Sequence, residues 1–392
     1  MSHFMKAGYK QHLKTNEMIE LVEKAVEVAE KAAETASEIK EITNAKDVSA
    51  ISKFENASMQ FKEGLSDEAL KARVEAAAHS ANKFFGIPDI ELVEGDAIGV
   101  YRKCDIFLDK DVFEYSLEQF KDMKCMSFED MTKVWAHECG HRILRMDFPS
   151  AWTQELGADF FSGVRSEMLG LPISNFEKVL GSTKGSETHP VGNLRVNAIQ
   201  YGREVVRIYQ SKGVEPTIEN CKEAFANSPY SKITYENYTE SKYAAWVDNT
   251  TSPRVIKTIN DDLVGQKYPK TGVPYAIKEV MNDAGERVIG VFPQFESKFE
   301  VQLPDEKISA SDREQFEEGD RQLKEKCEND PEFRSQFNSF QLDDIYSGKK
   351  PIGFTWHHDE ETGKLQLVTE ITHYDTPHTG GKTIWGGGNE NR

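Results

Sequence analysis

The chain has 392 residues, which is enough for two or three domains with sizeable cores. Its mean hydropathy of −0.60, together with the lack of any apolar run near the roughly 20 residues that span a bilayer, argues against a membrane-spanning protein. The net charge of −18 excludes a protein that coats nucleic acid or anionic membranes through bulk electrostatics, although it permits a local binding site.

The first residues, MSHFMKAGYKQHLK, lack an apolar segment after the lysines, so the sequence predicts no secretory signal. The five cysteines are odd in number and scattered without a CxxC pair, which is typical of reduced thiols. We therefore expect the chain to fold in the cytoplasm, and export by a specialised secretion machine remains compatible with this sequence.

The N-terminal region, residues 1–60, is dominated by one helical pattern. Residues 15–43 contain neither Gly nor Pro and predict a single long amphipathic helix. This helix either packs on its own protein or serves as a coiled-coil or docking helix, and three heptads with small Ala residues do not decide between the two. The apolar positions at 3-4 spacing are Ile19, Val22, Val26, Ala29, Ala33 and Ala36.

A second region, residues 61–215, begins as a mixture of helix and strand and becomes mostly helical after residue 128. SDEALKARVEAAAHSANKFF predicts a helix with Ser66 as its N-cap. IELVEG and AIGVYRKCDIFLD predict strands, and a helical stretch is expected to follow them up to residue 123.

The segment VWAHECGHRIL contains an HExxH pattern. On a helix, positions i and i+4 share one face, so His137 and His141 can bind one metal ion. Glu138 lies beside that face and can accept a proton from a zinc-bound water, whose pKa falls to about 7.

Further polar residues follow at suitable positions. Glu155 is a candidate third ligand, and Asp159, one turn later, can orient a ligand imidazole as an outer partner. His189 and Arg195 can donate hydrogen bonds to a tetrahedral oxyanion. The alternative interpretation is an ordinary charged helix face and a loop histidine that is fixed by its neighbouring proline.

HExxH, then E-x-x-A-D, then H-P-x-x-x-x-R, over roughly residues 80–210, resembles the gluzincin metallopeptidases of the M48 type. The resemblance implies a mainly helical domain in which His137, His141 and Glu155 bind Zn²⁺ and Glu138 is the general base. The resemblance does not identify the peptide substrate, and cleavage of the chain's own connecting segment is one alternative. An inactive peptidase is another.

Residues 216–253 are expected to form a linker, because residues 225–260 are polar and rich in turn formers. A second domain, residues 254–392, follows with hairpin-like segments and a charged helical stretch over 311–345. Its tail predicts a strand (IGFTWHH), a turn (DEETG), a second strand (KLQLV) and a short helix (TEITHYD), with Thr369 as the helix cap.

Four of the ten histidines, His357, His358, His373 and His378, lie in this tail. The hairpin and the helix with its following loop each contribute a pair, so the two pairs can surround one divalent ion and leave one imidazole as a base. Adjacent strand residues point in opposite directions, so His357 and His358 should differ in role. The arrangement suits metal-assisted phosphodiester hydrolysis, and the alternative is a metal clip that only stabilises a small domain.

The order GFTWHH, LQLV, HTGG and IWGGG, with LVGQKYPKTGVPY, GVFPQFESKFEVQLP, SDREQF and FRSQFNSFQLDDI before it, resembles the colicin-type DNase toxins, the WHH branch of the HNH (ββα-metal) nucleases. The resemblance implies an α+β nuclease domain ending in a ββα-metal motif. It further implies His357, His373 and His378 as the metal ligands and His358 as the general base. Histidine ligands leave the metal open among Mg, Mn, Zn and Ni. Phosphate binding is expected from backbone N–H groups and from Lys349, Lys350, Lys364 and Lys382.

Together these patterns predict an α+β multidomain bacterial toxin or effector that acts on DNA, or alternatively RNA, in the cytoplasm of a target cell. The second resemblance also implies a cognate immunity protein, and no membrane partner is expected. Two alternatives remain: a zinc metallopeptidase whose C-terminal region only binds nucleic acid or a partner, and an interaction protein in which both metal sites are structural. His358 separates them, because only a nuclease needs it for cleavage.

Overall fold

The computed structural model describes residues 67–386, apart from short gaps at 89, 97–98, 106–109, 123–127, 145–147, 149, 174, 240–242, 244–245, 247–248 and 250. The chain divides into two units, Met1–Leu65 and Ser66–Arg392, and everything described below belongs to the second. The helix expected over 15–43 and the N-terminal region 1–60 lie outside the described residues.

The described chain mixes helices and strands, which confirms the α+β class. Its first part is mainly helical. The elements are α3 (Asp67–Phe84), β1 (Glu91–Glu94), β2 (Val100–Asp105), β3 (Lys110–Tyr115), α4 (Leu117–Asp122), α5 (Phe128–Leu144), α6 (Ala151–Met168), α7 (Asn175–Gly181), α8 (Gly192–Ser211), α9 (Ile218–Ala226) and the 3₁₀ turn η1 (Pro229–Ser231).

The small sheet of this part has the order β1-β3-β2, with β3 parallel to β1 and antiparallel to β2. The helical stretch expected after the strands is α4, and one further strand, β3, precedes it. Val112, Phe113 and Tyr115 are buried in the core, and β-branched and aromatic residues of this kind favour a strand.

Helices α6 and α8 pack closely because each has a glycine at the contact. A Cβ on Gly163 would lie 2.1 Å from the Ile199 carbonyl oxygen, and one on Gly202 would lie 2.2 Å from that of Phe160. Any larger residue would push the two backbones apart. This contact brings the polar residues of α6 and α8 within bonding distance of each other.

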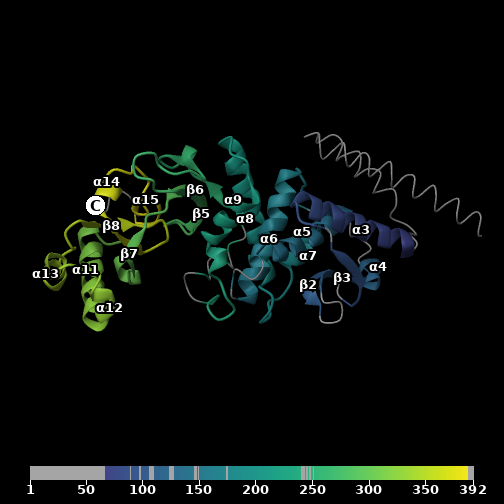
Figure 1. The fold of residues 1–392 in the computed structure, drawn as a ribbon, viewed down its shortest axis with the longest axis horizontal. Coiled ribbons are helices and arrows are strands. Elements are labelled where there is room, and N and C mark those ends of the chain that lie inside the picture. Colours follow the sequence, from purple (N-terminus) through teal and green to yellow (C-terminus); the bar gives the residue numbers. More distant parts are fainter. Residues whose placement is uncertain are drawn as a thin grey trace, which may run out of the picture. The chain divides into compact units, whose positions relative to one another are not determined.

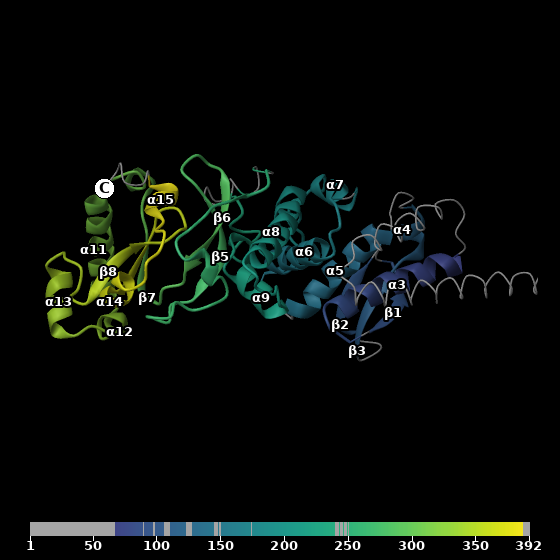
Figure 2. The same ribbon diagram turned by 90° about the horizontal axis from the view of Figure 1, so that it is seen from above.

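The second part contains two three-stranded sheets, ordered β4-β6-β5 and β7-β9-β8. Helices α11 and α13 lie beside the second sheet, as both Figure 1 and Figure 2 show. The elements are β4 (Arg254–Val255), η2 (Asp261–Leu263), β5 (Tyr275–Met281), β6 (Arg287–Pro293), β7 (Ser297–Gln302), η3 (Asp305–Lys307), α11 (Asp312–Asn329), α12 (Pro331–Arg334), α13 (Ser339–Tyr346), β8 (Phe354–His358), β9 (Lys364–Thr369), α14 (Glu370–Tyr374) and α15 (Lys382–Trp385).

The tail follows the expected strand, turn, strand and helix. Strands β8 and β9 pair antiparallel, with His357 opposite Gln366 and His358 opposite Leu365. Helix α14 begins at Glu370 and Thr369 occupies its N-cap position, but the Thr369 side chain makes no capping hydrogen bond.

The segment expected as a linker, 216–253, contributes to the protein core. It contains α9 and η1, and Phe225 and Tyr230 are fully buried in it. Their hydrophobic cluster includes Tyr275 and Ile289 from strands β5 and β6, so the helical part and the first C-terminal sheet share one core. The domain limits at 215 and 254 stay predictions.

Candidate metal centres and catalytic groups

Three of the tail histidines converge. His357 comes from the end of β8, His373 from α14, and His378 from the loop that follows α14. One ring nitrogen from each lies within 4.8 Å of the others, and His373 Nε2 is 3.3 Å from His357 Nδ1. The ring of Phe295 contacts all three imidazoles, at centroid distances of 4.8, 5.4 and 5.1 Å, and forms an apolar wall of the cluster.

Burial keeps these imidazoles neutral, which is the form that binds metal. Burial, and then the neighbouring histidines, hold the pKa of His357 well below its usual value. Burial also lowers the pKa of His373 to about 4 and lowers the pKa of His378. Nδ1 of His357 is the nitrogen that approaches His373, while Nε2, among the described residues, is a buried nitrogen without a hydrogen-bond partner.

The ring of His378 is oriented by the backbone. Its Nδ1 lies 2.7 Å from the carbonyl oxygen of Thr376, to which it donates when protonated. This hydrogen bond assigns the proton to Nδ1 and leaves Nε2 as the ligand nitrogen, which is the usual outer contact of a metal-binding histidine.

His358 is on the opposite face of β8 from the three ligands. Its Nε2 lies 2.8 Å from Gln315 Oε1, and its ring packs on Phe316 and Trp385. The Gln315 amide is itself oriented, because its Nε2 donates to the carbonyls of Lys307 and Ile308, each at 2.8 Å. Gln315 Oε1 must therefore accept, so neutral His358 carries its proton on Nε2 and has Nδ1 as its basic nitrogen.

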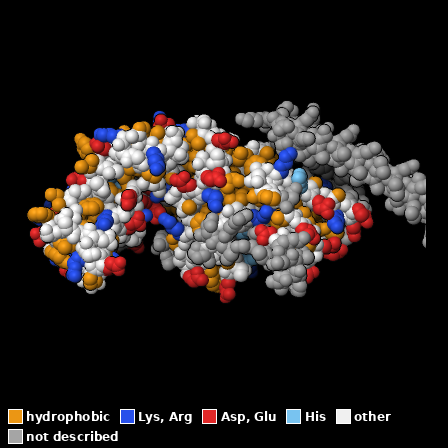
Figure 3. Space-filling model, viewed as in Figure 1, with side chains coloured by type: hydrophobic (Ala, Val, Ile, Leu, Met, Phe, Trp, Pro, Cys, Tyr) orange, Lys and Arg blue, Asp and Glu red, His pale blue; other side chains and the backbone are white. Residues whose placement is uncertain are grey.

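Three of the four predicted phosphate-binding lysines have protein partners for their side chains. Lys382 is only 3% exposed and donates to Ala310 O at 2.7 Å and to Gln315 Oε1 at 3.0 Å. It therefore helps to hold the Gln315 amide that contacts His358. Lys350 donates to Phe354 O at 2.9 Å and pairs with Glu370, and Lys364 lies near Glu300 and Asp359. Lys349 is exposed. On the face drawn in Figure 3, basic and acidic side chains are interspersed and form no broad cationic surface.

The HExxH residues form a second cluster. His137 and His141 lie on one face of α5, with their Nε2 atoms 3.2 Å apart. Glu155, from α6, places Oε2 3.4 Å from His137 Nε2 and Oε1 3.4 Å from His141 Nε2. The three groups converge as the spacing predicted, and Glu138 is buried on the same helix.

Asp159 and Arg195 contact this cluster from outside, and Arg195, expected as an oxyanion donor, is paired with carboxylates. Asp159 Oδ1 is 2.8 Å from His137 Nδ1, and Arg195 from α8 binds Asp159 at 2.7 Å and approaches Glu155 at 3.4 Å. His189 lies at the margin, 56% exposed, with its Nε2 3.8 Å from Glu155.

The charges of this cluster compensate one another despite burial. Burial lowers the pKa of His137, but the carboxylates of Asp159 and Glu155 outweigh it and raise that pKa to about 10. Burial raises the pKa of Asp159, but Arg195 and His137 lower it more. The carboxylates thus remain ionised, and His137 holds a proton at neutral pH that it must release before it can bind a metal ion.

Sequence reasoning missed Gln315 and Phe295, which contact the tail histidines from far away in the chain. Both lie in stretches that carried the second resemblance, SDREQF and GVFPQFESKFEVQLP, and these stretches were the available signal.

Residues 284–380 match the family model of the DNase/tRNase domain of colicin-like bacteriocin. The match includes all four tail histidines and leaves out the HExxH helices. No curated protein and no solved structure is significantly similar to the chain. The matched segment supports a nuclease, a hydrolase of nucleic acid phosphodiester bonds, in the C-terminal part of this chain.

Proposed function

We propose that the chain is a bacterial toxin or effector whose C-terminal part is a metal-dependent endonuclease acting on DNA. The observation that carries this proposal is the division of the adjacent histidines. His357 joins His373 and His378 on one side of β8, while Gln315 orients His358 on the other side. A merely structural metal site has no need of the second arrangement.

The tail residues have separate roles in this proposal. His357, His373 and His378 hold the divalent ion, Mg, Mn, Zn or Ni. When bound, the ion neutralises the scissile phosphate and stabilises the leaving oxygen. His358 Nδ1 accepts the proton of the attacking water, and Gln315 keeps the opposite ring nitrogen protonated. Phosphate binding relies on Lys349, on the other tail lysines where their protein partners release them, and on backbone N–H groups.

The test uses the purified full chain with supercoiled plasmid and, separately, with structured RNA. We expect nicking of the plasmid with at least one of Mg²⁺, Mn²⁺, Zn²⁺ and Ni²⁺, and its loss with EDTA. Cleavage of RNA alone would replace the DNase with an RNase, and no cleavage of either by the folded chain would contradict the proposal.

The proposed biology follows from this activity. A colicin-like nuclease acts in the cytoplasm of a target cell, and the producing cell needs an immunity protein that blocks it. The chain would fold in the cytoplasm and leave by a specialised route. None of the helices in the described part of the chain is long and apolar enough to cross a membrane.

A second activity, zinc-dependent peptide hydrolysis, is favoured by the HExxH cluster. His137, His141 and Glu155 would hold Zn²⁺, Glu138 would take the proton of water, and His189 with Arg195 would donate to the developing oxyanion. Its substrate is a peptide or the chain's own segment 216–253.

Self-cleavage has a direct test. Wild-type and Glu138→Gln proteins are incubated with Zn²⁺, and their fragments are compared by mass. A fragment ending within 216–253 in the wild type alone would establish self-processing, and identical patterns would exclude it. Burial of Phe225 and Tyr230 restricts cleavage to parts of the segment outside the core.

A further inference from the structure

The loop that carries His378 is hydrogen-bonded to residues 259–275, which precede the segment that matches the family model. The Tyr275 hydroxyl donates to the carbonyl oxygen of Pro377 at 2.6 Å, and Asn260 Nδ2 donates to the same oxygen at 2.7 Å. The backbone N–H of Ile259 donates to Thr379 Oγ1 at 3.0 Å. The residues on both sides of His378 are thus fixed from a distant part of the chain.

Two more contacts join the same two segments. The hydroxyls of Thr271 and Thr376 lie 2.7 Å apart, and Lys270 Nζ lies 2.7 Å from Asp375. Thr376 is buried, and its carbonyl is the group that orients the His378 ring. The contacts therefore fix both the backbone of His378 and the acceptor that sets its ring.

We propose that Tyr275 and Asn260 are positioning residues that hold His378 in its metal-binding orientation, an inference that rests on the proposed nuclease site. Two donors converge on one carbonyl, directly before the ligand. The Tyr275 side chain is fully buried, so its hydroxyl has little freedom to turn elsewhere. Loss of an outer contact of this kind typically costs about 10- to 100-fold in metal affinity.

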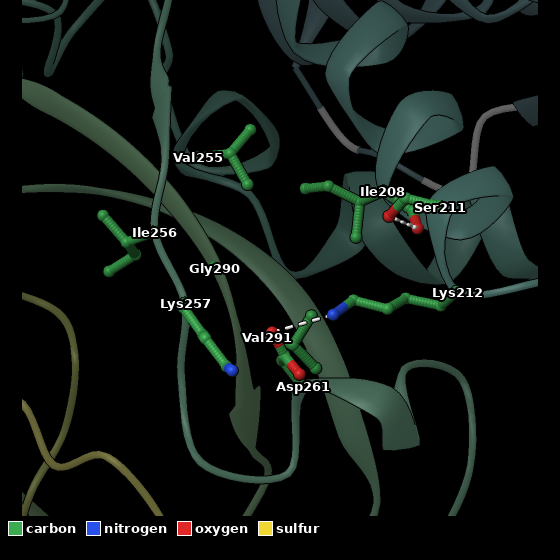
Figure 4. Close-up of a pocket in the computed structure, with 9 residues that line it drawn as sticks. All are labelled: Ile208, Ser211, Lys212, Val255, Ile256, Lys257, Asp261, Gly290 and Val291. Atoms are coloured by element: carbon green, nitrogen blue, oxygen red, sulfur yellow. Dashed lines mark hydrogen bonds and ion pairs between the residues drawn. The ribbon is translucent and has the colours of Figure 1, made fainter.

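The segment 259–275 is itself held by contacts with other parts of the protein. Asn260 has a left-handed backbone, with φ of 64°, which asparagine tolerates better than most residues. Its neighbour Asp261 pairs with Lys212 at the end of α8 at 2.8 Å. Figure 4 shows this ion pair beside Ile256 and Lys257, in a hollow of about 390 Å³ between α8 and strands β4 and β6. The His378 loop is thus connected to the helical part of the protein.

The experiment measures Ni²⁺ binding to the full chain by competition with a chromophoric chelator. All proteins carry His141→Ala, so that the HExxH cluster lacks a ligand. We expect Tyr275→Phe to weaken Ni²⁺ binding by about 10-fold or more, and Asn260→Gly, which keeps the left-handed backbone, to weaken it less. Plasmid cleavage by both should recover when the metal is saturating, which a general folding defect would not allow.

The matched control is Tyr209→Phe, another buried tyrosine, which lies beside Gly265 but whose hydroxyl donates to the backbone carbonyl of Asn220, at 3.2 Å, and not to the His378 loop. It should bind Ni²⁺ as the parent does. Parent-like binding by both Tyr275→Phe and Asn260→Gly would overturn the inference. If the parent itself binds no metal and cuts no DNA, the proposed nuclease fails instead. If Tyr275→Phe proves unfolded, Asn260→Gly alone decides the outcome.

Discussion

At the scale of single residues, the HExxH cluster depends on a carboxylate outside the candidate ligand set. Asp159 binds the far side of His137 and is held there by Arg195. Asp159 keeps the ring in one tautomer and in one orientation.

We expect Asp159→Asn to weaken Zn²⁺ binding at this cluster by about 10-fold or more, because the amide can turn its NH₂ group toward the ring and because the charge is lost. Zn²⁺ competition in a His373→Ala background measures it. The control is Asp130→Asn on α5, a buried carboxylate that accepts from the Phe176 N–H. Equal Zn²⁺ affinities for the Asp159→Asn protein and its parent would refute a positioning role.

The candidate ligands could be predicted at this scale because helix and strand periodicity is local. The i, i+4 spacing places His137 and His141 together, and alternation along a strand separates His357 from His358. Gln315 and Tyr275 could not be found in this way. They reach the tail from about 40 and 100 positions away, and only tertiary packing brings them there.

At the scale of elements, the turn between β8 and β9 contains an unusual buried charge group. Asp359 and Glu360 are almost fully buried, and Lys278 from β5 pairs with Glu360 and lies 3.9 Å from Asp359. Burial, and then the charge of Asp359, raise the pKa of Glu360 to about 7 although Lys278 opposes them. This turn fixes the end of the strand that carries His357 and His358.

The raised pKa has a definite consequence for stability. Glu360 is ionised in the unfolded chain above its ordinary pKa of 4.5, whereas the folded protein retains its proton up to a pH of about 7. The stability that this group contributes is therefore present below pH 4.5 and is lost as the pH rises to about 7, by at most about 1.4 kcal/mol per pH unit.

Glu360→Gln should remove this loss. As the pH rises from 5 to 8, the variant should therefore become more stable relative to the wild type, as judged by the free energy of unfolding. Urea titrations at several pH values measure it. Glu361→Gln is the matched control. The pKa of Glu361 is lowered to about 2, so its carboxylate is ionised in both the folded and the unfolded protein over this range. A pH-independent difference for Glu360→Gln would contradict the account.

Strand β3 shows why the elements were only partly predictable. Its residues KDVFEY mix charges with buried apolar side chains, and a six-residue segment carries too little periodicity to distinguish helix from strand. Its pairing with both β1 and β2 decides the conformation. The tail hairpin was predictable because strong β formers flank a DEETG turn.

At the scale of the whole molecule, one buried arginine connects the helical part to the C-terminal sheet. Arg287 on β6 pairs with Glu279, and its other nitrogens contact Asn197 of α8 at 2.9 Å and the Tyr230 hydroxyl at 2.9 Å. Composition showed a polar, turn-rich connector, but it could not show that the connector's few aromatic residues fill this shared core.

We expect Arg287→Met to lower the free energy of unfolding by about 3–5 kcal/mol, because Glu279 is left buried without its partner. Arg254→Met removes an exposed pair with Glu286 and should cost about 1 kcal/mol or less. Guanidinium unfolding followed by tryptophan fluorescence gives both values. A small loss for Arg287→Met would show that the two parts do not depend on this contact.

The central claim is that the tail histidines form a nuclease site in which three residues bind metal and one acts as the base. The most direct measurement compares His358→Ala with His373→Ala in the full chain, recording Ni²⁺ affinity and plasmid nicking for each. We expect His358→Ala to bind metal as the wild type does and to lose at least about 100-fold in cleavage rate, within the usual range for a general base. His373→Ala should lose both. Cleavage at the wild-type rate by His358→Ala would contradict the account.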